Sequence, residues 1–217
     1  MSFTASSVVF DLDGTLIDSK PGILESFGTA VAGVFPGQEF DLSTVVLGPP
    51  LQRMFQTAFP SAGEKEIVEL LRLFRAHYNE KGSLHVSVYE GAFEVLSECR
   101  RRGIVLDIAT NKPLRISLSI LAHLKLDTYF RSVLAIDSIE PQFASKSEIL
   151  RHLLRSRGLP ANKVFYVGDS SEDAAAAAAC GLRFIWAAYG YGRLKKEECA
   201  GFFGTINKLG DLAAFLP

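Results

Sequence analysis

The chain has few cysteines, little net charge and no long apolar run, and each of these absences excludes a class of protein. Its three cysteines are widely spaced along 217 residues and form no CxxC pair, which argues against a disulfide framework and against a zinc site. The formal net charge is −1 at pH 7, and the longest basic run is the arginine triplet at residues 100–102. The spacing of the cysteines predicts free thiols, and because no basic stripe is present, we expect no nucleic-acid partner.

Membrane segments are also missing from the pattern. No apolar stretch approaches the roughly 20 residues of a membrane span. Residues 1–7 are polar and lack the basic and apolar parts of a secretory signal. Hydrophobic residues nevertheless make up 48% of the chain, which is ample for a buried core. We expect a soluble, cytoplasmic protein that has no membrane partner.

Five short apolar runs have the composition of buried strands. They are rich in Val, Ile and Phe and do not alternate cleanly with polar residues, as expected for a sheet that is covered on both faces. Helical patterns separate the last four runs, which indicates a Rossmann-like α/β fold with a parallel sheet and right-handed crossovers. The expected strands are residues 8–10, 104–109, 133–136, 164–167 and 184–188, and the expected helices are 92–102, 114–124, 147–156 and 172–180.

A long helical segment interrupts this alternation after the first strand. Residues 21–34 and 64–81 have helical patterns, and a shorter helix is expected after the Gly-Pro-Pro at 48–50. We therefore predict an α/β core formed by residues 1–17 and 83–217, with an all-helical insert at 18–82. An insert at this point follows the carboxyl end of a strand, where ligands bind in open α/β sheets, so it is placed like a lid.

Acidic residues gather at the ends of two expected strands. Asp11 and Asp13 follow the first run, and positions two apart in an extended chain share a face, so both carboxylates can address one site. The segment GDSSED, residues 168–173, follows the fourth run and supplies Asp169 and Asp173. Carboxylate oxygens are preferred ligands of hard cations, so these strand ends predict a cation site. An Asp-Gly pair alone is also a common turn sequence.

A hydroxyl and an ammonium complete the pattern. Thr110 follows the second run, and Lys146 opens an amphipathic helix. Beside carboxylates and a cation, these groups are suited to a phosphoryl group. In the alternative interpretation, Thr110 caps a turn and Lys146 is a surface lysine. Lys163 is a second candidate cation, but it precedes a strand and is expected at the opposite end of the sheet.

These segments resemble, in order and spacing, the four motifs of the haloacid dehalogenase (HAD) superfamily. DLDGTLIDS at residues 11–19 resembles motif I, Thr110-Asn111 motif II, Lys146 motif III and GDSSED motif IV. The resemblance covers nearly the whole chain. The alanine-rich segment after GDSSED and the Tyr-Gly-Tyr-Gly at 189–192 are similar to the phosphoglycolate phosphatase-like branch, which carries a helical cap between motifs I and II.

The resemblance implies a role for each motif residue. Asp11 would be the nucleophile that forms an aspartyl-phosphate, and Asp13 would act as general acid and then general base. Mg²⁺ would bind Asp11, Asp169 and the backbone carbonyl of Asp13. Thr110, with the backbone around Asn111, would hydrogen-bond phosphoryl oxygens. Lys146 would neutralise the negative charge that repels an anionic substrate from the nucleophile. Asp173 would support Lys146 or the metal's waters.

The sequence departs from this branch at motif III, and its signal weakens outside the motifs. The branch commonly has Lys-Pro where this chain has Lys146-Ser147, which places the loop conformation in question. Asn111 and Lys112 are candidates for holding the phosphoryl group or the substrate. Arg53, shortly after the Gly-Pro-Pro, is a candidate for binding a substrate carboxylate or second phosphate, and a solvated arginine is the alternative.

The predicted function is that of a Mg²⁺-dependent phosphatase acting on a small phosphorylated metabolite such as a phosphoglycolate-like compound, a sugar phosphate or a nucleotide. A phosphomutase of the β-phosphoglucomutase type is the alternative, and a phospho-aspartate receiver module is a further one. Receivers are about half as long and lack a large helical insert. A dehalogenase would have no use for a second acid at Asp13, and no GxxxxGK[ST] motif of a P-loop kinase occurs. The substrate and the oligomeric state are not encoded in any pattern that we recognise.

Overall fold

The chain folds into two compact units, and a computed structural model describes residues 7–194, 199 and 201–217. The core unit comprises Met1–Asp18 and Ser87–Pro217, and the helical unit comprises Ser19–Val86. No helix in the described part of the chain is long and apolar enough to cross a membrane. Cys99 and Cys180 are free thiols, as expected.

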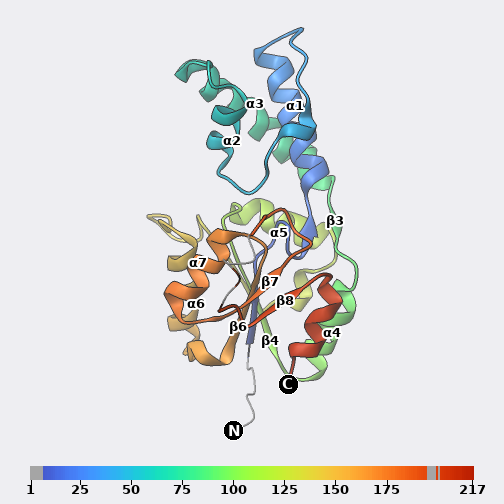
Figure 1. The fold of residues 1–217 in the computed structure, drawn as a ribbon, viewed down its shortest axis with the longest axis vertical. Coiled ribbons are helices and arrows are strands. Elements are labelled where there is room, and N and C mark those ends of the chain that lie inside the picture. Colours follow the sequence, from blue (N-terminus) through green and yellow to red (C-terminus); the bar gives the residue numbers. More distant parts are fainter. Residues whose placement is uncertain (1–6, 195–198, 200) are drawn as a thin grey trace. The chain divides into compact units, whose positions relative to one another are not determined.

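A six-stranded parallel sheet forms the centre of the core unit (Figure 1). The chain runs from the central strand to one edge, then returns and fills the other side, which is the order of a doubly wound sheet. The expected α/β, Rossmann-like fold is therefore confirmed. In spatial order the strands are β5 (Ser132–Ala135), β4 (Val105–Thr110), β1 (Ser7–Phe10), β6 (Val164–Gly168), β7 (Arg183–Ala187) and β8 (Gly204–Ile206).

Helices cover both faces of this sheet. In Figure 1, α6 and α7 lie against one face, and α4 lies with η6 against the other. The α6 and α7 face encloses an apolar cluster in which buried Ala176 and Ala177 let α7 pack closely against its neighbours. The helices that the structure describes with bounds in this unit are α4 (Ala92–Arg101), α5 (Leu114–His123), η3 (Asp127–Tyr129), α6 (Lys146–Arg157), η4 (Ala161–Lys163), α7 (Ser171–Cys180) and η6 (Leu209–Phe215).

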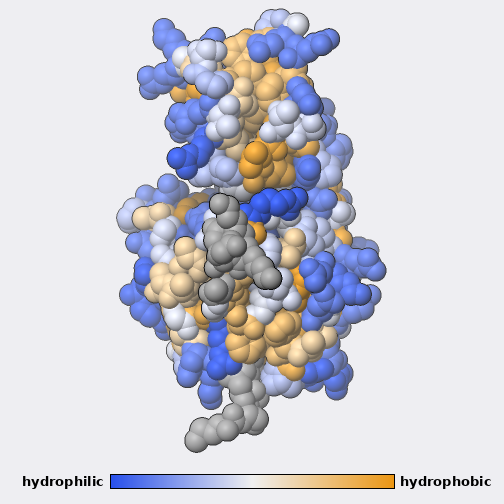
Figure 2. Space-filling view, in the orientation of Figure 1, coloured by the Kyte–Doolittle hydropathy of each residue, from blue (hydrophilic) through white to orange (hydrophobic). Residues whose placement is uncertain are grey.

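The helical unit is built around aromatic contacts. Helices α1 and α3 pack together, and the Phe27 ring stacks on the Phe55 ring with their centroids 4.2 Å apart. Figure 2 shows a band of apolar residues on the visible face of this unit, bordered by hydrophilic residues. Residues 19–86 contain no strand, whereas Asp18, the first residue of the predicted insert, lies in a short strand. The unit consists of α1 (Lys20–Val34), η1 (Leu42–Thr44), α2 (Leu51–Ala58), α3 (Glu64–Glu80) and η2 (Gly82–Leu84).

Three short strands were not expected from the sequence. β2 (Ile17–Asp18) and β3 (Ser87–Val88) form an antiparallel pair at the two points where the chain leaves and re-enters the core unit. β8 adds a sixth strand to the sheet by pairing with β7. Elements of two or three residues are too short to show a hydrophobic period, so the pattern of apolar residues does not reveal them.

Candidate active site

Three neighbouring strands bring the predicted residues to one edge of the sheet. β1 lies between β4 and β6, and Phe10 is in register with Ile108 and Val167. Asp11 follows the central strand directly, while Thr110 ends β4 and Asp169 follows β6. Because all three strands are parallel, their carboxyl ends coincide, and the residues far apart in sequence meet.

Lys146 is held between two carboxylates at this edge. Its Nζ donates to Asp11 Oδ1 at 2.7 Å and to Asp173 Oδ1 at 2.8 Å. Lys146 is the first residue of α6 and is buried, with Ser145 capping the helix through its hydroxyl. The Lys146 ammonium therefore lies at this edge of the sheet although Ser147 stands where the phosphoglycolate phosphatase-like branch commonly has proline. Lys163 ends η4 just before β6, at the opposite end of the strands.

Asp173 is enclosed by hydrogen-bond donors. Its Oδ1 also accepts from the Tyr166 hydroxyl at 2.7 Å, and its Oδ2 accepts from the Ser170 hydroxyl at 2.6 Å and the Ser170 N–H at 3.1 Å. Sequence reasoning missed Tyr166, which is fully buried within β6. The available signal was a tyrosine inside an apolar strand, because a buried hydroxyl requires a partner.

Asp169 is held by a glycine-rich loop. Its Oδ2 accepts the backbone N–H groups of Tyr191 at 2.6 Å and Gly192 at 3.0 Å. Gly14 has φ +79°, and a Cβ at this position would lie 2.5 Å from Asp169 Oδ2. A side chain at Gly192 would likewise collide with the Asp169 backbone. The glycines of DLDGTL and of the Tyr-Gly-Tyr-Gly segment therefore permit the backbone to close around this carboxylate.

Asp13 forms an ion pair that the sequence did not indicate. Lys112 Nζ lies 2.9 Å from both carboxylate oxygens of Asp13. Thr110 Oγ1 accepts the Lys112 backbone N–H at 3.1 Å, which folds the loop back on the strand end and leaves the hydroxyl hydrogen for another acceptor. The exposed Asn111 donates its amide to Glu172 at 2.9 Å. Lys112 thus contacts the second acid of motif I.

Burial and mutual charge shift the pKa values of the acidic groups in different directions. Burial raises the pKa of Asp11 well above its ordinary value, although the Lys146 ammonium opposes this shift. Burial also raises the pKa of Asp169 to about 6, and Asp173 adds to this effect. Asp173 behaves oppositely, because the Lys146 ammonium and the surrounding donors outweigh burial and lower its pKa. Burial disfavours the charge on Lys146, but Asp11 and Asp173 hold its pKa above the ordinary value.

The donor set is compatible with a hard divalent cation. Carboxylate oxygens of Asp11, Asp169 and Asp173 lie within 4.8 Å of one another. Three carboxylates and the Lys146 ammonium leave two negative charges, which a divalent ion would balance. The hydrogen bonds that Asp11 and Asp169 make with other described residues use one oxygen of each, whereas both oxygens of Asp173 are used. Asp11 and Asp169 are therefore better placed to provide ligands than Asp173.

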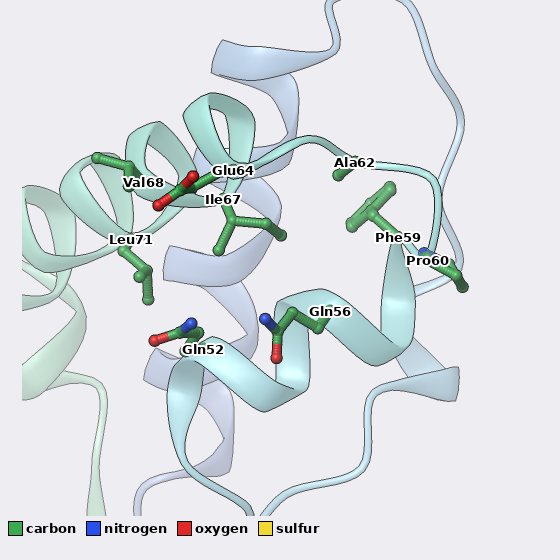
Figure 3. A pocket seen from close by; sticks show the side chains of 9 residues that line it. All are labelled: Gln52, Gln56, Phe59, Pro60, Ala62, Glu64, Ile67, Val68 and Leu71. Carbon is green, nitrogen blue, oxygen red and sulfur yellow. The ribbon is translucent and has the colours of Figure 1, made fainter.

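A separate hollow lies within the helical unit. It has a volume of about 710 Å³ and is lined by α2, α3 and the turn between them. Figure 3 shows Gln52 and Gln56 of α2 on one side, with Ile67 and Leu71 of α3 facing them. Arg53 is exposed on α2 and is not part of this lining.

Comparison with known proteins agrees with the motif pattern. The model of the haloacid dehalogenase-like hydrolase family matches residues 8–187. The chain belongs to this family. Phosphoglycolate phosphatase 1 of Pseudomonas aeruginosa is 32% identical over 94% of this chain and 77% of its own length. This similarity confirms the phosphoglycolate phosphatase-like branch.

Other proteins that are similar to this chain carry different names. Tyrosine-protein kinase PtkA of Mycobacterium tuberculosis is 36% identical over 86% of this chain, which spans only 63% of that protein's length. The crystal structure of a predicted phosphatase from Clostridium acetobutylicum is 30% identical, has a TM-score of 0.83 and covers 98% of each chain. The matches therefore extend over both units of this chain.

Proposed function

We propose that this chain is a Mg²⁺-dependent phosphatase that hydrolyses a small phosphomonoester through an aspartyl-phosphate on Asp11. The observation that carries the proposal is the position of the Lys146 ammonium, which lies between Asp11 and Asp173 at the edge where Asp169 also lies. A buried cation there reduces the repulsion between an anionic substrate and the Asp11 carboxylate. The candidate substrates are phosphoglycolate, which the name of the Pseudomonas relative contains, a sugar phosphate and a nucleotide.

In the first step, an Asp11 oxygen attacks phosphorus and the bond from phosphorus to the leaving oxygen breaks. Asp13 gives its proton to that oxygen, which departs as an alcohol. In the second step, Asp13 removes a proton from water, the water oxygen attacks phosphorus, and the bond from Asp11 to phosphorus breaks. Inorganic phosphate leaves, and the Asp11 carboxylate is restored.

The other residues hold the phosphoryl group and the charges. Thr110, through its hydroxyl hydrogen, and the backbone at Asn111 bind phosphoryl oxygens. Asp11, Asp169 and the backbone carbonyl of Asp13 would hold Mg²⁺, which supplies additional positive charge to the phosphoryl oxygens when bound. Asp173 acts indirectly, because its contacts orient the Lys146 ammonium toward Asp11.

The helical unit is proposed to act as a cap that selects the leaving group. A mobile lid that closes over a phosphoryl site excludes bulk water and adds contacts to the part of the substrate that does not react. Arg53, exposed on α2, is the candidate for contacting a substrate carboxylate or a second phosphate through its planar guanidinium.

Substitution of Asp11 tests the mechanism. Asp11→Asn should retain the fold and lose hydrolysis by several orders of magnitude, since it removes the nucleophile. Phosphate release from a panel of phosphorylated metabolites should be measured with Mg²⁺ for both proteins. Near wild-type turnover by the folded variant would exclude the aspartyl-phosphate route.

Two further measurements separate phosphatase activity from its alternatives. The first measures both the isomer and the free phosphate formed from a sugar phosphate, because a phosphomutase would form the isomer without releasing stoichiometric phosphate. The kinase name of one relative is addressed by offering ATP with a tyrosine peptide, because transfer to the peptide without ester hydrolysis would contradict the proposal.

A further inference from the structure

The ion pair between Lys112 and Asp13 is the least expected contact in the site. The two residues lie 99 positions apart, and Lys112 reaches Asp13 from the loop after β4. The Lys112 side chain is 7% exposed and that of Asp13 is 24% exposed, so the lysine is the more deeply buried partner. A surface lysine normally lays its aliphatic stem on the protein and keeps its ammonium in water. The burial of the Lys112 side chain therefore distinguishes it from an ordinary surface lysine.

The geometry of the contact fixes the direction of the Asp13 carboxylate. Lys112 Nζ is 2.9 Å from Oδ1 and 2.9 Å from Oδ2, so the ammonium lies evenly between the two oxygens. When one oxygen of a carboxylic acid carries the proton, the other can still accept a hydrogen bond from an ammonium. Loss of one of the two contacts would therefore leave the other to hold the carboxylate.

The backbone of the same loop is tied to the strand end. Thr110 Oγ1 accepts the Lys112 N–H at 3.1 Å, and the Ser117 hydroxyl donates to Pro113 O at 3.0 Å at the start of α5. These bonds restrict where the Lys112 side chain begins, and a restricted side chain is an effective support for another group.

We propose that Lys112 is a positioning residue that holds the Asp13 carboxylate in line for proton transfer to and from the phosphoryl centre. This inference rests on the proposed function, in which Asp13 serves the leaving oxygen and then water. Lys112 acts through Asp13 and is distinct from Lys146, which contacts Asp11 and Asp173.

The proposal predicts a dependence on the leaving group. The value of kcat/KM reports steps up to the transfer of phosphorus to Asp11. An alkyl ester such as glycerol 2-phosphate needs a proton on its leaving oxygen, whereas 4-nitrophenolate leaves readily without one. Loss of Lys112 should therefore affect the alkyl ester more strongly than 4-nitrophenyl phosphate.

The experiment compares wild type, Lys112→Met, Lys112→Arg and the matched surface control Lys163→Met on both esters. Since a well-placed general acid contributes on the order of 10²-fold or more, Lys112→Met should reduce kcat/KM for glycerol 2-phosphate by roughly 30-fold or more and for 4-nitrophenyl phosphate by less than about threefold. The inhibition constant of inorganic phosphate should stay close to the wild-type value. Lys112→Arg, which keeps a cation, should recover most of the lost activity, and Lys163→Met should behave as wild type.

A double-mutant cycle tests whether Lys112 acts through Asp13. In an Asp13→Asn background, adding Lys112→Met should reduce kcat/KM for the alkyl ester by less than about twofold, because coupled residues are not additive. This comparison remains available if Lys112→Met alone is poorly folded, since the double variant removes both charges.

The possible failures are distinguishable. Equal losses on both esters with weaker phosphate inhibition would show that Lys112 binds the phosphoryl group, and wild-type kinetics in Lys112→Met would show that it has no role. Either result overturns the positioning role alone. A wild-type protein that hydrolyses neither ester and no member of the metabolite panel would overturn the proposed function and the Lys112 role together.

Discussion

Replacing Lys146 by methionine should destabilise the core unit strongly at neutral and alkaline pH. Methionine is similar in length but removes the ammonium that lies between Asp11 and Asp173. Lys146 is 5% exposed, Asp11 5% and Asp173 0%, so the two carboxylates cannot turn to bulk water without moving the backbone. The substitution therefore leaves buried negative charges without their cation.

The expected loss in the free energy of unfolding follows from the burial of the three side chains and not only from the distances between them. Removing one member of a buried ion pair typically costs about 3–5 kcal/mol, much more than the loss of a surface pair. For a chain of this size, a change of 1 kcal/mol shifts Tm by about 2–4 °C, so the variant should melt roughly 10 °C below wild type.

Lowering the pH should reduce this difference. Burial already raises the folded-state pKa of Asp11, and without Lys146 it should rise further, while the pKa of Asp173 should change from lowered to raised. A carboxyl group with a raised folded pKa gains stability as pH falls through that pKa, because the folded state then binds the additional proton. In wild type, the lowered pKa of Asp173 has the opposite effect, and its stabilisation is lost as pH falls. The Tm difference should therefore be larger at pH 8 than at pH 5.5.

Thermal denaturation followed by circular dichroism, in the presence of a chelator, measures both effects. Lys163→Met is the matched control, because this exposed lysine lies at the other end of the strands. A Lys146→Met variant within about 1 kcal/mol of wild type at pH 8 would refute the reasoning, since the buried carboxylates would then not depend on the ammonium.

Two further predictions concern the cation and the cap. Because burial raises the pKa of Asp169 to about 6, Mg²⁺ binding by calorimetry should weaken as pH falls through 6, approaching roughly tenfold per unit for each proton displaced. Unchanged affinity between pH 7 and pH 5 would argue against Asp169 as a ligand. Ca²⁺ should inhibit hydrolysis, because its higher coordination number would let it bind both oxygens of Asp11, the proposed nucleophile. Arg53→Ala should reduce kcat/KM for the best natural substrate by about tenfold or more, about 1.4 kcal/mol, while largely sparing 4-nitrophenyl phosphate. Equal losses on both substrates would assign Arg53 a structural role.

The order of secondary-structure elements was largely readable from the sequence, because local patterns determine it. The Val- and Phe-rich run that ends before Asp11 and the run that ends before Asp169 became β1 and β6. The helical insert that interrupts the alternation of strands and helices was also visible, since two long helical patterns follow each other there without a strand between them. What the pattern could not supply were β2, β3 and β8, whose few residues pair only because longer elements bring them together.

The acidic residues of the candidate site could likewise be named from motif order. Asp11 and Asp169 stand out because they directly follow buried strands, and Asp13 and Asp173 because they lie in the same two acidic segments. Their roles remain proposals, and their partners required the tertiary structure. Tyr166 was missed although a tyrosine inside an apolar strand needs a partner, and only the structure shows that its hydroxyl donates to Asp173 at 2.7 Å.

Sequence alone determined which chemical groups the chain places at strand ends, because strand and helix patterns are local. Only the tertiary structure decided which group faces which. Lys112 lies in the loop after β4, and Lys146 is the first residue of α6. Lys112 contacts Asp13, whereas Lys146 lies between Asp11 and Asp173. That choice depends on strand order, because β1 lies between β4 and β6, and on the backbone turns that aim each side chain. These three contacts join residues that are 99, 135 and 27 positions apart, and no local pattern encodes them.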